Sequence, residues 1–197
     1  MSATLRPPTV SSQPAPPEYE APSLSFLHGT WHVTHSTLPM WKSKRNVRIS
    51  YTPLPPSTPS VSAEHTDRLD DIVTYQGLSG TKVHEVHGVD KASSESRDSW
   101  DWRGKGWLMI ASSHWEVLGW GQEQATQDGK PNNWAVTYFA KTLFTPAGID
   151  IYSSSESGLQ EETVLSIKRA LTEIYDEGVK KLAGEILEIK RDGGRTD

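Results

Sequence analysis

The chain has 197 residues, a formal net charge of -5 and a sequence pI near 5.8. This length fits one domain. The acidic balance argues against a general nucleic-acid-binding protein, which needs a cationic surface to neutralise phosphates. The absence of cysteine excludes disulfides, thiolate catalysis and cysteine-based zinc sites, and it fits a reducing compartment.

The sequence also bears on membranes and on location. No apolar run approaches the length that crosses a bilayer, so we expect no membrane span. The first 20 residues contain Pro and Glu where a secretion signal needs an apolar stretch. We therefore expect a cytoplasmic protein.

The two ends of the chain differ in composition from its middle. Residues 1–23 hold six of the 13 prolines together with several Ser and Thr. Such a segment buries too little apolar surface to offset its ordering entropy. We predict a disordered Pro-rich tail over residues 1–23, one folded domain over residues 24–190, and a frayed polar tail over residues 191–197.

The folded region begins with short segments whose apolar residues alternate with a period near two, which is typical of an antiparallel sheet. Turn residues separate these segments, among them Pro53, Gly77, Gly104 and Pro146. The pattern predicts eight or nine strands, over residues 29–36, 45–52, 68–76, 81–89, 97–103, 106–112, 114–120, 133–141 and 148–153.

Beyond Tyr152 the apolar residues recur at steps of three and four, as on one face of a helix. Val164 and Leu171 belong to this apolar stripe, and Glu161 and Glu162 suit the positive end of a helix. We predict a single amphipathic helix from about residue 159 to the 180s. Strands followed by one helix form either a closed barrel with the helix outside or a sandwich, and closure removes exposed strand edges.

Four segments carry a resemblance to a known family. The first strand contains Gly29-Thr30-Trp31, and residues 113–120, 133–138 and 148–153 follow in order before the helix. This order and spacing is similar to that of the bacterial-type lipocalins of the calycin superfamily. The resemblance implies a mainly β, up-and-down antiparallel barrel with one C-terminal helix packed outside it. It also implies that Trp31 closes one end and that a small apolar molecule binds at the other.

The chain departs from the lipocalin pattern just after the last strand. Lipocalins usually place an Arg there to stack on the tryptophan, whereas this chain has Ser153-Ser154-Ser155. Either another side chain covers Trp31 or the kinship is distant.

Aromatic residues are the strongest candidates for ligand contact, because eight tryptophans is a high content for this length. An indole offers a large apolar area and one N–H donor, although a single Trp is more often part of a packed core. Met40 and Trp41, followed by bases, would form a lid at the open end of a lipocalin-like barrel, or alternatively a solvated basic turn. The predicted ligand-binding residues are Trp41, Tyr51, Tyr75, Trp100, Trp102, Trp115, Tyr138 and Arg45.

A barrel interior could also hold an acid or a base. If Trp31 points inward, His35 does too by alternation, and Glu85 and His87 share one face of a later strand. Because a dry aromatic cavity shifts the pKa of such groups, His35, Glu85 and His87 are the candidate catalytic residues. The alternative is that they are exposed or hydrogen-bonded. His84 and His87 lie on opposite faces of a strand, so we predict no metal site and no cofactor.

Three functions remain open. The first is a barrel that binds a small hydrophobic molecule, and the second is an isomerase or cyclase that acts on a polyene or terpenoid-like substrate in the same cavity. The third is an interaction module that acts through the Pro-rich tail. Whether the protein is an enzyme, and its oligomeric state, are left open by the sequence.

Overall fold

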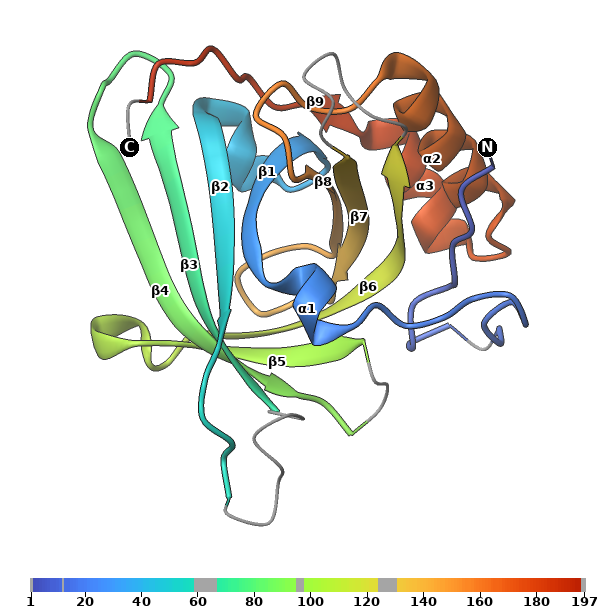
Figure 1. The fold of residues 1–197 in the computed structure, drawn as a ribbon, viewed down its shortest axis with the longest axis horizontal. Helices are drawn as coiled ribbons and strands as arrows, with labels where there is room; N and C mark the ends of the chain where they lie inside the picture. The colour runs from blue at the N-terminus through green and yellow to red at the C-terminus, as the bar shows by residue number, and fades with distance from the viewer. Residues whose placement is uncertain (1, 12, 59–66, 95–97, 124–130, 196–197) are drawn as a thin grey trace.

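The computed structural model describes residues 2–11, 13–58, 67–94, 98–123 and 131–195 (Figure 1). Each barrel strand pairs antiparallel with the next, and the last pairs with the first, so that the sheet closes. This confirms the predicted up-and-down barrel of mainly β class. The eight strands are β1 (Gly29–Ser36), β2 (Lys44–Pro53), β3 (Arg68–Gly77), β4 (Val83–Ala92), β5 (Ser99–Gly104), β6 (Ser112–Glu123), β7 (Asn132–Phe139) and β8 (Gly148–Ser153).

Two short elements sit at the edges of the barrel. The helix α1 (Leu24–Leu27) precedes β1, and the two-residue strand β9 (Leu187–Glu188) pairs with the end of β1 outside the barrel. The 3-10 helix η1 (Pro39–Ser43) connects β1 to β2.

The prediction of a strand over residues 106–112 is wrong. The 3-10 helix η3 (Gly106–Leu108) occupies this place, and β6 begins only at Ser112. Gly106 has φ +61, a left-handed conformation that residues with a side chain rarely adopt. The backbone therefore turns at Gly106 instead of extending from it.

The predicted single C-terminal helix is two helices, α2 (Glu161–Glu173) and α3 (Glu177–Glu185), both outside the barrel (Figure 1). The Asp176 side chain accepts a hydrogen bond from the Val179 N–H at 3.0 Å, which is the contact of a helix N-cap. A new helix therefore starts at this point. In the described part of the chain, neither helix nor any other has the length and apolarity that crossing a bilayer would take.

Alternation along the strands creates two apolar cores on opposite sides of the sheet. One fills the barrel interior, and the other lies between the outer face of the sheet and the helices. The interior core contains Leu27, Trp31, Val33, Leu38, Trp41, Val47, Ile49, Tyr51, Leu69, Trp100, Trp115, Val117, Ala135, Tyr152 and Ile189. The outer core contains Leu5, Leu118, Trp134, Val136, Tyr138, Ile149, Ile151, Ile167, Ala170, Leu171, Ile174, Val179, Ala183 and Ile186.

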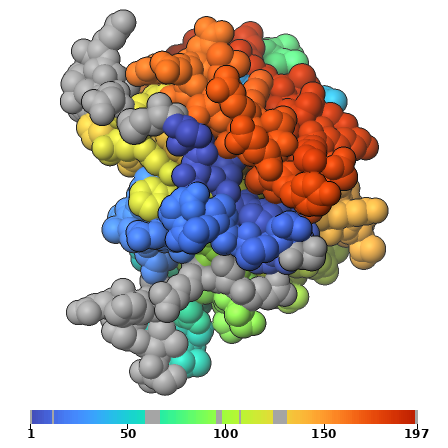
Figure 2. All heavy atoms as spheres, turned by 90° about the vertical axis from the view of Figure 1, so that its right-hand side faces the viewer, coloured from blue at the N-terminus to red at the C-terminus, as the bar shows by residue number. Residues whose placement is uncertain are grey.

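The N-terminal segment packs on the barrel, which corrects the prediction of a disordered tail for its described residues. Figure 2 shows it lying against the C-terminal helices, and the Ala3 N–H donates to the Ser166 hydroxyl at 3.0 Å. The Arg6 guanidinium is buried between Asp98, at 2.8 Å, and Glu116, at 2.6 Å. A Pro-rich composition does not reveal that one cation pairs with two buried carboxylates, so composition alone missed this docking.

We predict that Arg6→Ala destabilises the fold strongly. Removing the cation leaves the carboxylates of Asp98 and Glu116 buried without it, which typically costs about 3–5 kcal/mol. Denaturant unfolding measures this loss. Arg103→Ala is the control because Arg103 is exposed, and it should change the free energy of unfolding by less than about 0.5 kcal/mol. Equal effects of the two substitutions would contradict the prediction.

Candidate functional site in the barrel interior

Trp31 and its neighbours close one end of the barrel. The Trp31 indole is buried, and its Nε1–H donates to the Leu27 carbonyl at 2.9 Å. The Phe26 ring of α1 lies 5.3 Å from the Trp31 ring, and the Tyr152 ring lies 6.4 Å away on the inner side. Phe26 therefore contacts Trp31 in place of the Arg that lipocalins usually provide.

A stack of aromatic rings forms the floor above Trp31. The Trp115 ring stacks on Tyr51 at 5.3 Å and on Trp100 at 6.2 Å. All three side chains point inward, as expected of ligand-binding candidates, but they are buried against one another. They therefore form the base of the interior, and a ligand would reach them only from above.

The open half of the interior is different, because its inward side chains are only half-buried. Val73, Tyr75, Val86, Trp102 and Phe139 alternate with outward residues on four strands and keep accessible surface. Inward side chains that stay accessible border a space that solvent reaches. The sequence-predicted residues Tyr75 and Trp102 line this space.

Two contacts shape this open half. Trp41, from η1, is buried, and its ring lies 5.9 Å from the Tyr75 ring in a T-shaped arrangement. The His84 ring stacks on the Tyr75 ring at 5.5 Å. A Cβ atom at Gly88 would lie 2.2 Å from Trp102 Nε1. The Trp102 indole therefore lies against the bare backbone of β4 at Gly88.

Three carboxyls on inward positions were missed by the sequence reasoning. Asp90 accepts a hydrogen bond from Trp115 Nε1 at 2.7 Å, and Asp150 accepts from the Ser36 hydroxyl and from Trp41 Nε1 at 3.3 Å. Burial raises the pKa of Asp90 and the pKa of Asp150 to about 7. Alternation with the inward residues would have found these carboxyls once the inward face of each strand was known.

Asp71 is the third of these carboxyls. Burial, and then the charge of Asp90, raise the pKa of Asp71 well above its ordinary value. Within the residues that the structure describes, Asp71 Oδ1, Asp90 Oδ2 and Trp100 Nε1 are buried without a hydrogen-bond partner. Such atoms usually have partners in folded proteins, so each is an unsatisfied polar group inside the barrel.

The three candidate catalytic residues do not face the interior. A β-bulge between Val33 and His35 shifts the alternation, so His35 lies on the outer face. Burial, and then the charge of Lys168, lower the pKa of His35 to about 4. Glu85 and His87 share a face as predicted. That face is the outer one, because Gly88 and Asp90, which alternate with Glu85 and His87 along β4, face inward. On the outer face, His87 Nε2 lies 2.8 Å from Asp70 Oδ1.

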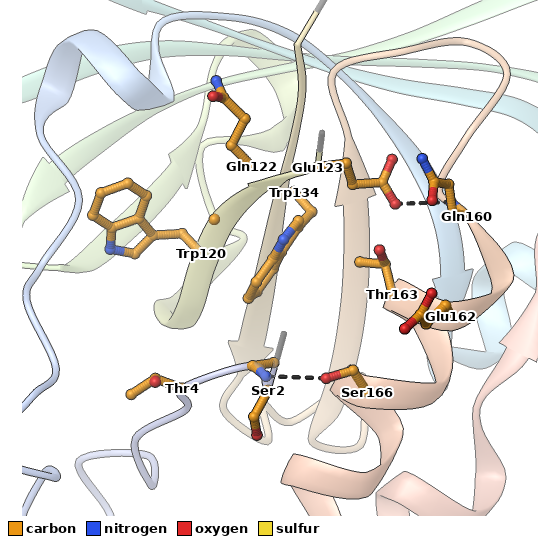
Figure 3. A pocket seen from close by; sticks show the side chains of 12 residues that line it. Ser2, Thr4, Trp120, Gln122, Glu123, Trp134, Gln160, Glu162, Thr163 and Ser166 are labelled. Atoms are coloured by element: carbon orange, nitrogen blue, oxygen red, sulfur yellow. Dashed lines mark hydrogen bonds between the residues drawn. The ribbon is translucent and has the colours of Figure 1, made fainter. Parts of the chain in front are cut away.

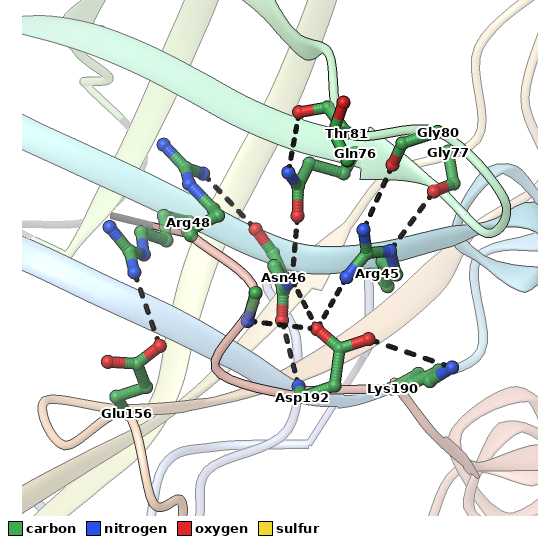
Figure 4. A network of polar contacts seen from close by, with 12 residues as sticks. Arg45, Asn46, Arg48, Gln76, Gly77, Gly80, Thr81, Glu156, Lys190 and Asp192 are labelled. Atoms are coloured by element: carbon green, nitrogen blue, oxygen red, sulfur yellow. Dashed lines mark hydrogen bonds and ion pairs between the residues drawn. The ribbon is translucent and has the colours of Figure 1, made fainter. Parts of the chain in front are cut away.

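Tyr138 and Arg45 also lie outside the cavity that was predicted for them. Tyr138 belongs to the outer core beneath the helices. Arg45 Nη1 donates to Asp192 at 2.5 Å, and the guanidinium also donates to the carbonyls of Gly77 and Gly80 (Figure 4). Asp192 also accepts from Asn46 Nδ2, so described residues of the segment predicted to fray are held to β2.

A second hollow lies outside the barrel (Figure 3). Its volume is about 320 Å³, and it lies between the N-terminal segment, the end of β6, the start of β7 and the start of α2. Trp120 and Trp134 form part of its wall, and Gln160 donates its backbone N–H to Glu123. Among described residues, no group of three or more His, Asp or Glu is placed to hold a metal ion.

Searches with the sequence matched no family model and no curated protein. Comparison of the structure did find similar folds. Lobster apocrustacyanin A1 is 12% identical, with a TM-score of 0.56 over 87% of this chain and 81% of that chain. Insecticyanin from the tobacco hornworm Manduca sexta is 15% identical, with a TM-score of 0.54 over 88% and 83%.

Siderocalin Q83 is 16% identical, with a TM-score of 0.55 over 88% of this chain and 94% of that chain. These likenesses, together with the closed eight-stranded barrel, show that the chain has the lipocalin fold. The fold implied by Gly29-Thr30-Trp31 and the last strands is thereby confirmed.

We predict that Asp150→Asn reduces the dependence of stability on pH. The pKa of Asp150 rises from 3.8 to about 7 on folding, so the folded state binds the proton more tightly than the unfolded chain. The resulting stabilisation, about 4 kcal/mol, is full below pH 3.8 and is lost as the pH rises to about 7. Asn stays neutral throughout this range.

Thermal unfolding across this pH range measures the effect. The slope of Tm against pH should be shallower in Asp150→Asn than in the unmodified protein. Asp101→Asn is the control, because its side chain is exposed on the outer face beside His114. An unchanged slope in Asp150→Asn would show that the carboxyl does not change its pKa on folding.

Proposed function

We propose that the protein binds a small, largely apolar molecule in the open half of its barrel. One observation carries this proposal: Val73, Tyr75, Trp102 and Phe139 point inward above a packed aromatic floor and are only half-buried. Covering apolar surface that folding leaves accessible is favourable by roughly 25 cal/mol per Å². A ligand that fills this space gains that stabilisation.

The structural neighbours support the proposal through their fold. Siderocalin Q83 has a dual ligand binding mode, which is a property of that protein. Because one fold hosts many functions, the ligand of this chain is inferred from its own interior residues.

The polar atoms of the floor indicate what else the ligand contains. Asp90 Oδ2 and Trp100 Nε1 are buried and lack partners in the described part of the chain. One offers an acceptor and the other a donor. We infer an apolar ligand with at least one polar atom at the end that enters first. Pairing with these groups requires the floor side chains to move, because both atoms are fully buried.

Titration with parinaric acid, a fluorescent polyene, tests the proposal. Binding should saturate and quench tryptophan fluorescence. Trp102→Ala removes apolar contact worth about 1.5–3 kcal/mol and should weaken binding at least about tenfold. Trp120→Ala is the matched control, since the Trp120 indole lies outside the barrel against Phe26 and donates to the Glu20 carbonyl.

Two results would count against the binding proposal. One is the absence of saturable binding by parinaric acid and by every molecule that mass spectrometry finds copurified with the protein. The other is equal weakening by Trp102→Ala and Trp120→Ala, which would place the bound molecule outside the barrel.

An isomerase or cyclase that uses the same cavity is the second candidate function. The observation that favours it is Asp90, an interior carboxyl whose pKa burial raises to about 7. Such a group can give or take a proton near neutral pH, which the outward-facing His35, Glu85 and His87 cannot do for a ligand inside. Asp90→Asn should then lower conversion of the copurified molecule while leaving its binding intact.

We also infer a cytoplasmic location. The chain has no cysteine to form a disulfide, and this composition supports a reducing compartment. Fractionation of the cells that make the protein tests this inference.

A further inference from the structure

Four of the strand connections lie at the same end of the barrel, opposite the end that Trp31 closes. Because consecutive strands of an up-and-down barrel alternate in direction, the connections after β1, β3, β5 and β7 all lie at one end. These rim loops are residues 37–43, 78–82, 105–111 and 140–147. The first and last are neighbours, since the Thr37 N–H donates to the Ile149 carbonyl at 2.9 Å, just after the last loop.

The rim loops concentrate exposed apolar side chains. Eleven large apolar side chains are exposed in the described ranges, and six of them lie on these loops. The other five are scattered over the N-terminal segment, β6, α2, the turn between α2 and α3, and β9. The rim residues and their exposed fractions are Met40 46%, Leu78 50%, Met109 60%, Ile110 91%, Leu143 95% and Phe144 82%.

The rim loops are also cationic in a chain whose net charge is -5. Each contains one lysine and none contains Asp or Glu, the lysines being Lys42, Lys82, Lys105 and Lys141. Lys105 pairs with Asp70 of β3 at 2.5 Å. The three connections between the other strand ends, residues 54–67, 93–98 and 124–131, contain five acidic and two basic residues in sequence.

From this arrangement we propose that the rim loops dock on an anionic phospholipid bilayer, with their apolar tips in the lipid and their lysines at the headgroups. Apolar side chains next to lysines bind such an interface through buried apolar area and attraction to anionic lipids. The tips lie on four separate loops, each highly exposed. Separate tips can each enter a fluid surface, whereas a protein partner needs one continuous complementary patch.

This docking does not depend on the ligand proposed above, because the rim residues are distinct from the residues that line the interior. When the rim loops are docked, the open end of the barrel faces the lipid. Exchange of an apolar ligand between the barrel and the bilayer would rest on the proposed function. The two ideas are separable, since vesicle binding reports on the rim and parinaric acid on the interior.

Cosedimentation of the full chain with vesicles tests the proposal. The vesicles are phosphatidylcholine alone or phosphatidylcholine with about a third phosphatidylserine. We expect binding to the anionic vesicles and at least about fivefold weaker binding to the neutral ones, since each lysine near such a surface contributes a factor of about five. Added salt should weaken the binding.

Loop substitutions identify the surface. Leu143→Ser with Phe144→Ser, or Met109→Ser with Ile110→Ser, should each lower vesicle affinity at least about tenfold. Leu165→Ser with Tyr175→Ser is the matched control, because both side chains are exposed on the helical side, and it should leave the affinity unchanged. Thermal unfolding and parinaric acid binding of each variant confirm that the barrel is intact.

Three outcomes would overturn the proposal. The first is no binding of the unmodified protein to vesicles that contain phosphatidylserine. The second is equal loss of affinity in the rim and control variants. The third is self-association in light scattering that the rim variants abolish while vesicle binding is absent, which would make the rim an interface between copies of this chain.

Discussion

The pairing of β1 with two partners is the constraint on which the rest of the structure depends. The first half of β1 pairs with β2 and its second half with β8, so one eight-residue strand joins the first and last edges of the sheet. Closure gives every strand one inner and one outer face. The inner face then holds the aromatic floor and the open half, and the outer face holds the N-terminal segment and the helices.

The double pairing also explains where alternation fails. Along its length β1 passes from pairing with β2 to pairing with β8, and the bulge between Val33 and His35 lies in the part that pairs with β8. One extra residue in a bulge exchanges the inner and outer faces beyond it. His35 therefore faces out even though Trp31 and Val33 face in, and Ser36 can reach the inward Asp150.

What the sequence could predict follows from the range of each interaction. Strand alternation is a local pattern, so the strands of the barrel and the shared face of Trp100 and Trp102 were predictable. For Glu85 and His87 alternation showed a shared face, but which face points inward is decided by closure, a contact between distant strands. The docking of Arg6 on Asp98 and Glu116 is likewise a long-range contact.

The helix break shows the opposite case, a local signal that periodicity concealed. The apolar stripe runs through both helices, because Ile174 and Val179 both pack on the outer core. The helix is interrupted near Asp176, whose side chain caps the second helix, but the apolar stripe continues. A capping residue inside a periodic run was the signal for two helices.

The interior carboxyls are hard to explain by stability alone. Burial disfavours the charged form of Asp71, Asp90 and Asp150 and raises the pKa of each. Apolar residues of similar size would fill the same positions without that cost. Asp90 and Asp150 are partly compensated by the indole N–H groups of Trp115 and Trp41, so the carboxyls hold those rings in place, whereas Asp71 Oδ1 has no such partner among the described residues.

Apolar side chains are covered at one end of the barrel and partly exposed at the other. At the floor, Phe26 and Trp31 are covered by each other and by neighbouring rings, which closes that end to solvent. At the other end, Trp102 and Phe139 are only half-buried, and the loops that follow them in the chain carry exposed apolar side chains. Exposed apolar surface that gathers at one place usually marks a binding face. An interior and a rim that are both incompletely covered at the same end are explained together if that end meets an apolar phase.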